Sequence, residues 1–159
     1  MFRFWYRYVF SNRTLIETGA SDVVMKRRIE PTYSDYMGLV FEKVCRDYLM
    51  RENPCGELPI LFTSIGRWWG TDPKKHEQVE IDLIANDGDE YMFCECKWRN
   101  EKLDLPVLKS LMYKADVFRK NRGRTWFVLF SKSGFTDAVI EEAAKNNDVL
   151  LVDLGKITE

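Results

Sequence analysis

The stretch EIDLIANDGDEYMFCECKW, residues 80–98, carries the pattern that best predicts the fold. Residues 80–83 alternate acidic and apolar side chains and residues 84–85 are apolar. Residues 86–90 form a short polar turn, and residues 91–98 are again β-prone and apolar except for Glu95 and Lys97. This pattern predicts two strands joined as a hairpin. Because residues two apart in a strand share a face, Glu95 and Lys97 point the same way, and Asp82 is expected opposite them across the hairpin.

Two carboxylates and an ammonium on one face of an apolar hairpin require a chemical explanation. Binding of a divalent cation beside a phosphodiester is one, because Mg²⁺ prefers one or two protein carboxylates together with water and substrate oxygens. The other explanation is a set of solvated ion pairs across the hairpin, each worth roughly 0.2–1 kcal/mol. Glu80 shares the face of Asp82 and is a spare carboxylate in either case.

The spacing of these residues resembles the PD-(D/E)XK nuclease superfamily. The matching residues are Asp82 and, after a gap of twelve residues, Glu95-Cys96-Lys97, with Glu42 of an upstream helix completing the set. The resemblance implies a restriction-endonuclease-like core that hydrolyses DNA with Mg²⁺ or Mn²⁺, as an (endo)deoxyribonuclease. It implies catalytic roles for Glu42, Asp82, Glu95 and Lys97.

The same resemblance suggests how those roles are divided. Asp82, Glu95 and the carbonyl of Cys96 are expected as metal ligands, and Glu42 is expected to hold a second metal or a metal-bound water. Lys97 is expected to orient the attacking water or to stabilise developing negative charge.

A second resemblance extends over nearly the whole chain. It rests on the segments 4–9, 12–13, 38–42, 65–69 and 95–98, which are similar to the domain of unknown function at the C-terminus of archaeal-type AAA ATPases. In that family an ATPase module and a winged helix come first, so both are expected as partner modules in a longer protein. The chain contains no Gly-x-x-x-x-Gly-Lys-Ser/Thr phosphate loop, so we expect no ATPase activity from it.

The rest of the chain predicts an α/β fold with a mixed central sheet flanked by helices. Helical spacing predicts a helix over 33–50 that begins at Ser34 as N-cap, and further helices over 105–119 and 137–145. Strands are expected over 58–69, 79–86, 91–98, 125–131 and 149–154. The resulting order is α-β-β-β-α-β-α-β. Residues 1–32, aromatic and basic, are expected as a separate N-terminal helical segment preceding a nuclease-like domain at 33–159.

Three basic residues are candidates for contact with nucleic acid: Arg67, Lys109 and Lys114. Arg67 suits a phosphate equally well as it suits a neighbouring carboxylate, and solvated helix-face positions explain the two lysines. Trp68 and Trp69, adjacent on one strand, must face opposite ways. Cys94 and Cys96 fall on the face opposite Glu95, which favours buried thiols over a zinc site.

Composition limits the remaining functions. The 159 residues carry a net charge of −1, so nucleic-acid binding requires a local group of cations. No run of eighteen apolar residues is present, and four cysteines in unrelated contexts favour a cytoplasmic protein with no membrane association. The alternative to a nuclease is a catalytically inactive DNA- or protein-binding regulatory module of the ATPase.

Overall fold

The computed structural model describes residues 2–118 and 123–159. The chain divides into two compact units, Met1–Leu39 and Val40–Glu159, and helix α4 (Glu30–Glu52) belongs to both. The boundary therefore falls inside the helix, seven residues after the boundary expected at 32/33. None of the described helices combines the length and the apolar composition that crossing a bilayer requires.

The larger unit is built on a five-stranded mixed sheet in the order β1-β2-β3-β4-β5. Its strands are β1 (Ser64–Thr71), β2 (Gln78–Asp87), β3 (Glu90–Lys97), β4 (Thr125–Ser131) and β5 (Val149–Asp153). The first three pair antiparallel, as hairpins allow, whereas β3, β4 and β5 pair in parallel through the crossover helices α5 (Leu105–Phe118) and α6 (Asp137–Lys145). The predicted α/β class and element order are confirmed, with one short helix added, α7 (Leu154–Thr158).

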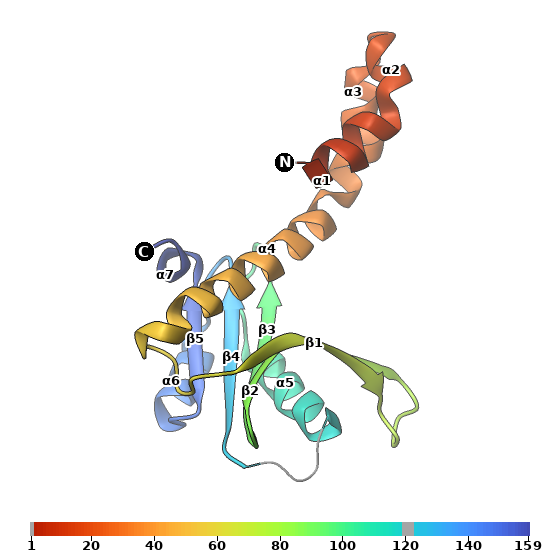
Figure 1. Ribbon diagram of the computed structural model, residues 1–159. Helices are drawn as coiled ribbons and strands as arrows, with labels where there is room; N and C mark the ends of the chain where they lie inside the picture. The colour runs from red at the N-terminus through yellow and green to blue at the C-terminus, as the bar shows by residue number, and fades with distance from the viewer. Residues whose placement is uncertain (1, 119–122) are drawn as a thin grey trace. The chain divides into compact units, whose positions relative to one another are not determined.

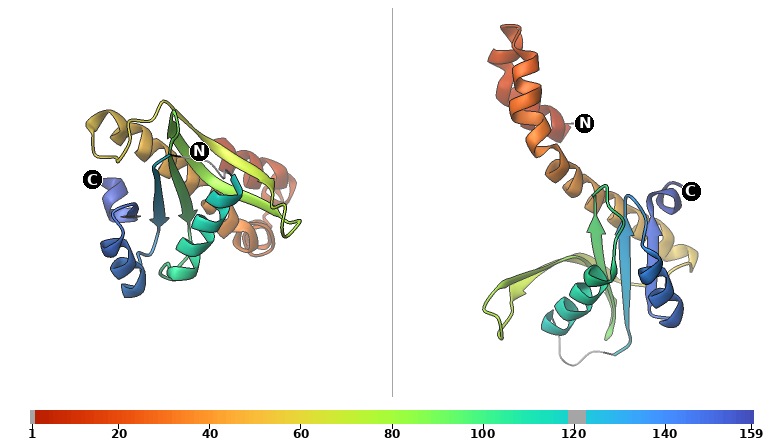
Figure 2. Two further views of the ribbon diagram at one scale, coloured as in Figure 1. Left: turned by 90° about the horizontal axis from the view of Figure 1, so that it is seen from below. Right: turned by 180° about the vertical axis from the view of Figure 1, so that it is seen from behind.

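Helices cover both faces of the sheet. The second half of α4 crosses one face (Figure 1), and the view from behind shows α5 and α6 over the other (Figure 2). Two buried clusters correspond to these layers. Cys45 and Leu49 of α4 pack with every second residue of β3 and β4. Leu108 and Leu111 of α5 pack with the residues in between, whose side chains point to the opposite face of the sheet. Sheets buried on both faces read as continuous apolar runs, which is why β4 contains almost no polar residue.

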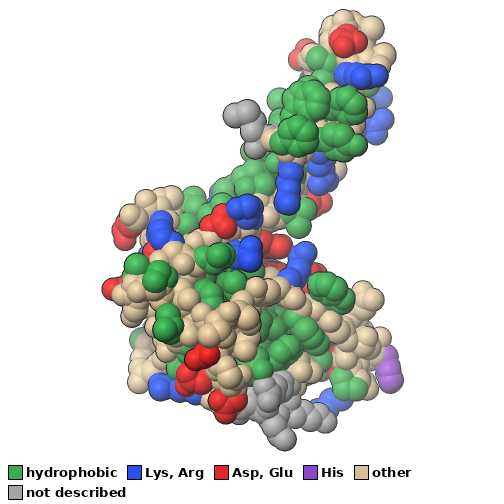
Figure 3. All heavy atoms as spheres, viewed as in Figure 1, with side chains coloured by type: hydrophobic (Ala, Val, Ile, Leu, Met, Phe, Trp, Pro, Cys, Tyr) green, Lys and Arg blue, Asp and Glu red, His purple; other side chains and the backbone are tan. Residues whose placement is uncertain are grey.

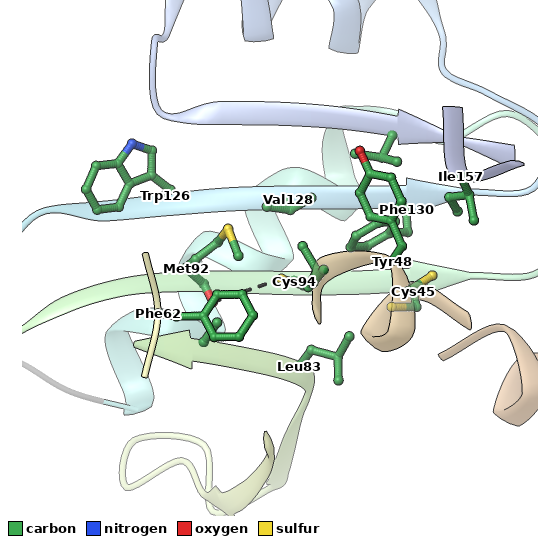
Figure 4. Packing of buried hydrophobic residues seen from close by; sticks show 14 of the residues in the cluster. Cys45, Tyr48, Phe62, Leu83, Met92, Cys94, Trp126, Val128, Phe130 and Ile157 are labelled. Carbon is green, nitrogen blue, oxygen red and sulfur yellow. Dashed lines mark hydrogen bonds between the residues drawn. The ribbon is translucent and has the colours of Figure 1, made fainter. Parts of the chain in front are cut away.

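The α4-facing cluster contains both cysteines of β3. Figure 4 shows Cys94 between the side chains of β2 and β4, near Cys45 and Tyr48 of α4. Cys94 and Cys96 are free, buried thiols, and desolvation raises the pKa of each well above its usual range. The prediction that they act as small core residues is confirmed.

Two predicted boundaries are wrong. The helix expected to start at Ser34 begins at Glu30, directly after a π-helical turn at Met25–Ile29, so Ser34 lies in a continuous helix with no free end to cap. The strand expected from Leu58 starts only at Ser64. Residues 58–63 carry apolar side chains because Ile60 and Phe62 fill the core from an irregular segment. Of the helix expected over 105–119, Arg119 lies outside the described residues.

The turn between β1 and β2 is tied to α5. Asp72, 1% exposed, accepts hydrogen bonds from the Tyr113 hydroxyl and from the backbone N–H of Lys74. The Lys75 ammonium lies 4.4 Å from the centre of the Tyr113 ring. His76 is exposed in the same turn with a positive φ of 56°. These contacts hold β1 in place although it is an edge strand.

The smaller unit is helical from Phe2 to Leu39, apart from a turn at Gly19. Tyr8 is buried, and its hydroxyl lies 2.9 Å from the hydroxyl of Thr32. Apolar side chains gather on the surface of this unit (Figure 3), among them the exposed rings of Phe2, Trp5 and Tyr6.

Candidate functional site

The site begins where β2 and β3 separate. Between Gly66↔Ile84 and Trp68↔Ile81 the register with β1 shifts, so that Asp82 and Leu83 of β2 stand opposite one residue, Arg67. Bulges of this kind re-aim side chains and occur next to active sites. The regular pairing of β2 with β3 runs from Asp87 to Leu83. Next to its end the Asp82 carboxylate accepts a hydrogen bond of 2.8 Å from the Cys96 N–H.

Glu95 is the buried centre of the site. Its side chain is 5% exposed and contacts two ammonium groups, Lys97 Nζ at 2.5 Å and Lys114 Nζ at 2.8 Å. Lys114, from the middle of α5, also lies 3.0 Å from the second carboxylate oxygen. Lys97 Nζ is 4.0 Å from Asp82 Oδ2. Lys97 therefore lies between the two predicted carboxylates, Asp82 and Glu95. Lys114 of α5 contacts the more buried of them, Glu95.

A second group of charges lies on the side of α4. The Arg67 guanidinium contacts Glu42 of α4 at 3.2 Å and Glu80 of β2 at 2.6 Å. Glu42 is close enough to Asp82 for the two carboxylates to repel each other. All four residues of the predicted catalytic set are thus brought to one region of the larger unit. Arg67 is paired with carboxylates in this structure, which was one of its two expected roles.

The ionisable groups are perturbed as a crowded acidic site requires. Burial, and then the charge of Glu95, raises the pKa of Asp82, although the Cys96 N–H opposes the shift. Burial and the charge of Asp82 likewise raise the pKa of Glu42. Burial lowers the pKa of Lys97, but the Glu95 carboxylate outweighs it and the net pKa of Lys97 is raised. Lys97 therefore stays an ammonium at neutral pH.

No group of three acidic, histidine or cysteine side chains able to hold a metal ion occurs in the described part of the chain. The pair Asp82 and Glu95 nevertheless fits a Mg²⁺ ion, which takes one or two carboxylates and completes its shell with water. Oδ1 of Asp82 accepts no hydrogen bond from the described residues, whereas both carboxylate oxygens of Glu95 contact lysine ammonium groups, which also offset the repulsion between the two carboxylates.

The two lysines that were candidates for contact with nucleic acid, Lys109 and Lys114, differ in their surroundings. Lys109 is exposed on α5, and it shows no contact with the cluster among the described residues. Lys114 is turned inward onto Glu95, a partner that the sequence did not indicate. Nothing in the spacing of positions 95 and 114 signals this contact, because it depends on how α5 packs on the sheet. The pairing of Arg67 with Glu42 could not be predicted from the sequence either, because the two residues are 25 positions apart and lie on different elements.

Comparisons with known proteins find relatives without an assigned activity. Residues 5–109 match the family described as archaeal and bacterial proteins of unknown function, DUF234. The uncharacterized protein MJECL04 of Methanocaldococcus jannaschii is 36% identical over 95% of this chain. The match covers 32% of that relative, so the chain spans about a third of its length.

A crystal structure, that of the protein of unknown function AF1548, superposes on 69% of this chain and 58% of its own. The TM-score is 0.45 and the sequence identity 17%. From the family match over residues 5–109, the chain belongs to the archaeal and bacterial family of unknown function, DUF234.

Proposed function

We propose that the cluster around Glu95 is the active site of a metal-dependent nuclease of the PD-(D/E)XK type, which hydrolyses phosphodiester bonds in DNA. One observation carries the proposal. Lys97 lies 2.5 Å from Glu95 and 4.0 Å from Asp82, at the point where β2 and β3 separate beside Glu42. A restriction-endonuclease-like core, with this helix, hairpin and parallel crossover, is part of the same proposal.

The carboxylates serve to hold the ion. Asp82 and Glu95 would supply its protein oxygens, and the Cys96 carbonyl would be a third donor. The Cys96 N–H orients the Asp82 carboxylate. When bound, Mg²⁺ or Mn²⁺ polarises the phosphate and provides a nucleophilic hydroxide near neutral pH. Lys114 keeps Glu95 oriented through contacts with both carboxylate oxygens. Glu42 of α4, which interacts with the charge of Asp82, would hold a water or a second ion next to it.

Lys97 supplies the positive charge that stabilises the transition state in this proposal. Its ammonium is partly exposed, with 35% of the side chain accessible, so it reaches the solvent-facing side of the carboxylate pair. A fixed positive charge there stabilises the charge that develops on the phosphate oxygens during hydrolysis. The raised pKa of Lys97 keeps that charge in place.

The relative from Methanocaldococcus jannaschii is about three times as long as the matched region, which leaves room for further modules in it. We place this chain in the cytoplasm, as the C-terminal part of an AAA-type ATPase whose ATPase and winged-helix modules control the nuclease. In this proposal the ATPase activity belongs to the other module, because this chain contains no phosphate loop.

A second candidate is a catalytically inactive DNA- or protein-binding regulatory module. The observation in its favour is that two lysines already neutralise Glu95, so the cluster is stable as an ion-pair network without any metal. The two candidates differ in whether Mn²⁺ binds at Asp82 and Glu95.

The test is cleavage of labelled single-stranded, duplex and branched DNA with Mn²⁺, together with calorimetric titration of Mn²⁺. The wild type is compared with Asp82→Asn/Glu95→Gln. The matched control is Asp87→Asn/Glu90→Gln, which removes the same two charges from the other end of the same hairpin. We expect cleavage and Mn²⁺ binding in the wild type and the control, and neither in the site variant.

Equal cleavage by the site variant and the wild type would refute the assigned site. If Mn²⁺ binds in a way that depends on Asp82 and Glu95 but no substrate is cleaved, the result would favour a nuclease whose activity requires the ATPase module. Absence of both would favour the regulatory module.

A further inference from the structure

One aromatic ring stands in solvent beside the candidate site. Trp69 is 73% exposed, and it is the only exposed Trp, Tyr or Phe side chain in the described part of the larger unit, residues 40–118 and 123–159. Single exposed apolar side chains are common on protein surfaces and need no explanation. The position of this one, however, relates it directly to the charged cluster.

The backbone holds Trp69 outward. Its neighbour Trp68 packs edge-on against Phe118 of α5, with ring centres 5.3 Å apart, and so belongs to the α5-facing layer. The Trp68 ring also lies over Gly70, where an added Cβ would come within 2.3 Å of it. Since successive residues of a strand face opposite ways, anchoring Trp68 directs Trp69 to the other side of β1. The indole is therefore presented on a fixed strand rather than on a mobile loop.

Trp69 adjoins the cluster through its partner strand. It pairs with Glu80, and Glu80 is bound at 2.6 Å by Arg67, two residues before Trp69 on β1. Asp82 lies in the bulge opposite Arg67. Two residues of a strand cover about 7 Å, so the indole is a neighbour of Arg67 and Glu80, which join Glu42 in the group of charges on the side of α4. A ligand whose charged group reaches the cluster can place an adjoining flat group on Trp69.

Nucleotides have that combination of groups. A base stacks on an aromatic side chain through its π-face, whatever its identity, and does so only when it is not already stacked within a duplex. Phosphates require positioned cations, and the net charge of −1 provides no general attraction. Arg67, 40% exposed, is the cation that binds the strand partner of Trp69, and Lys97, 35% exposed, contacts Asp82 and Glu95.

We propose that Trp69 is a stacking platform for an unpaired base, and that the site therefore acts on single-stranded or frayed nucleic acid. The base binds on the exposed indole, the phosphate next to it binds Arg67, and the strand continues past the bulge toward Asp82. The binding part of this proposal stands by itself, whereas cleavage of the bound strand rests on the proposed nuclease function.

Binding is measured by the fluorescence anisotropy of a labelled twelve-residue oligothymidine in low salt and EDTA. The full chain carrying Asp82→Asn is the background, so that neither metal nor cleavage enters. In this background Trp69→Ala is expected to weaken binding about 5- to 150-fold, the range that corresponds to loss of one stacked base. Trp69→Phe keeps most of the affinity because it keeps a π-face, and Trp69→Leu behaves like Trp69→Ala.

Two controls isolate the stacking. Trp5→Ala removes an exposed tryptophan from the smaller unit and is expected to leave binding unchanged. A blunt twelve-base-pair duplex is expected to bind more weakly than the single strand and to respond less than twofold to Trp69→Ala. Far-UV circular dichroism verifies that each variant is folded.

Equal affinity of Trp69→Ala and its background for the oligothymidine would overturn the proposal. Equal losses with single strand and duplex, or no binding of the single strand at all, would also overturn it. These outcomes are independent of the nuclease test, which concerns Asp82 and Glu95 in the presence of Mn²⁺. A working nuclease with unchanged binding in Trp69→Ala refutes only this inference.

Discussion

Replacing Glu95 by glutamine should destabilise the larger unit although the shape of the side chain is preserved. Glu95 is 5% exposed in its side chain and neutralises Lys97 and Lys114 at 2.5 and 2.8 Å. Glutamine has one acceptor oxygen in place of two and no charge, so Lys114 loses its counter-ion and Lys97 keeps only Asp82, at 4.0 Å.

The magnitude follows from the burial of the three partners. Breaking a buried ion pair from one side costs about 3–5 kcal/mol, because the remaining charge is left without a partner. Lys97 is partly accessible to water, which reduces the loss, and we expect about 2–3 kcal/mol. For a chain of this length 1 kcal/mol corresponds to about 2–4 °C in Tm, so the expected decrease is roughly 4–12 °C.

The assay is thermal unfolding followed by far-UV circular dichroism in EDTA, with Glu90→Gln as the control. Glu90 lies opposite Asp87 at the far end of the same hairpin and forms no ion pair with the described residues. Its replacement should change the free energy of unfolding by less than about 0.5 kcal/mol, as is usual for surface positions. Equal Tm values for the two variants would refute the reasoning.

A double-mutant cycle sharpens the result. Lys114→Met alone leaves Glu95 with one partner, whereas Glu95→Gln/Lys114→Met removes the buried charge together with its deeper counter-ion. Because each single variant leaves an uncompensated charge, the double variant should be more stable than the sum of the two losses predicts, by about 1–2 kcal/mol. Additive losses would show that Lys114 and Glu95 do not interact as the structure describes.

Three further outcomes are expected. Burial and a neighbouring carboxylate raise the folded-state pKa of Asp82, so its contribution to stability is present below the unfolded value of about 3.9 and is lost as pH rises through the folded value. Asp82→Asn should therefore gain stability relative to wild type in urea unfolding between pH 4 and 7, and a constant difference would contradict this. Gly70→Ala should cost about 1–3 kcal/mol by forcing the Trp68 ring to move, while Gly66→Ala, with nothing within 4 Å of its added Cβ, avoids that cost; equal losses would argue against the packing. Lys97→Ala should reduce cleavage by about 10²–10³-fold with a much smaller effect on calorimetric Mn²⁺ binding, and parallel losses would contradict its assigned role.

Local patterns predicted most of the secondary structure. The hairpin over residues 80–98 and the helices after it followed from side-chain periodicity, because each is decided by which neighbouring residues share a face. The same logic failed at residues 58–63, which lie outside the strand although Ile60 and Phe62 fill the core. It also failed at Ser34, where the preceding turn had already started the helix.

Glu42, Asp82, Glu95 and Lys97 were proposed as a set from the sequence because their spacing resembles that of PD-(D/E)XK nucleases, and the structure brings them to one region. The contacts that define the site were not predicted from the sequence. These contacts join different elements of the fold: the register shift at Asp82, the ion pair of Lys114 with Glu95 and the ion pair of Arg67 with Glu42. Such contacts depend on strand register and helix packing, which are set by the whole core. The alternation of a strand requires that Trp68 and Trp69 face opposite ways, but only the packing of α5 decides that Trp69 is the one left in solvent.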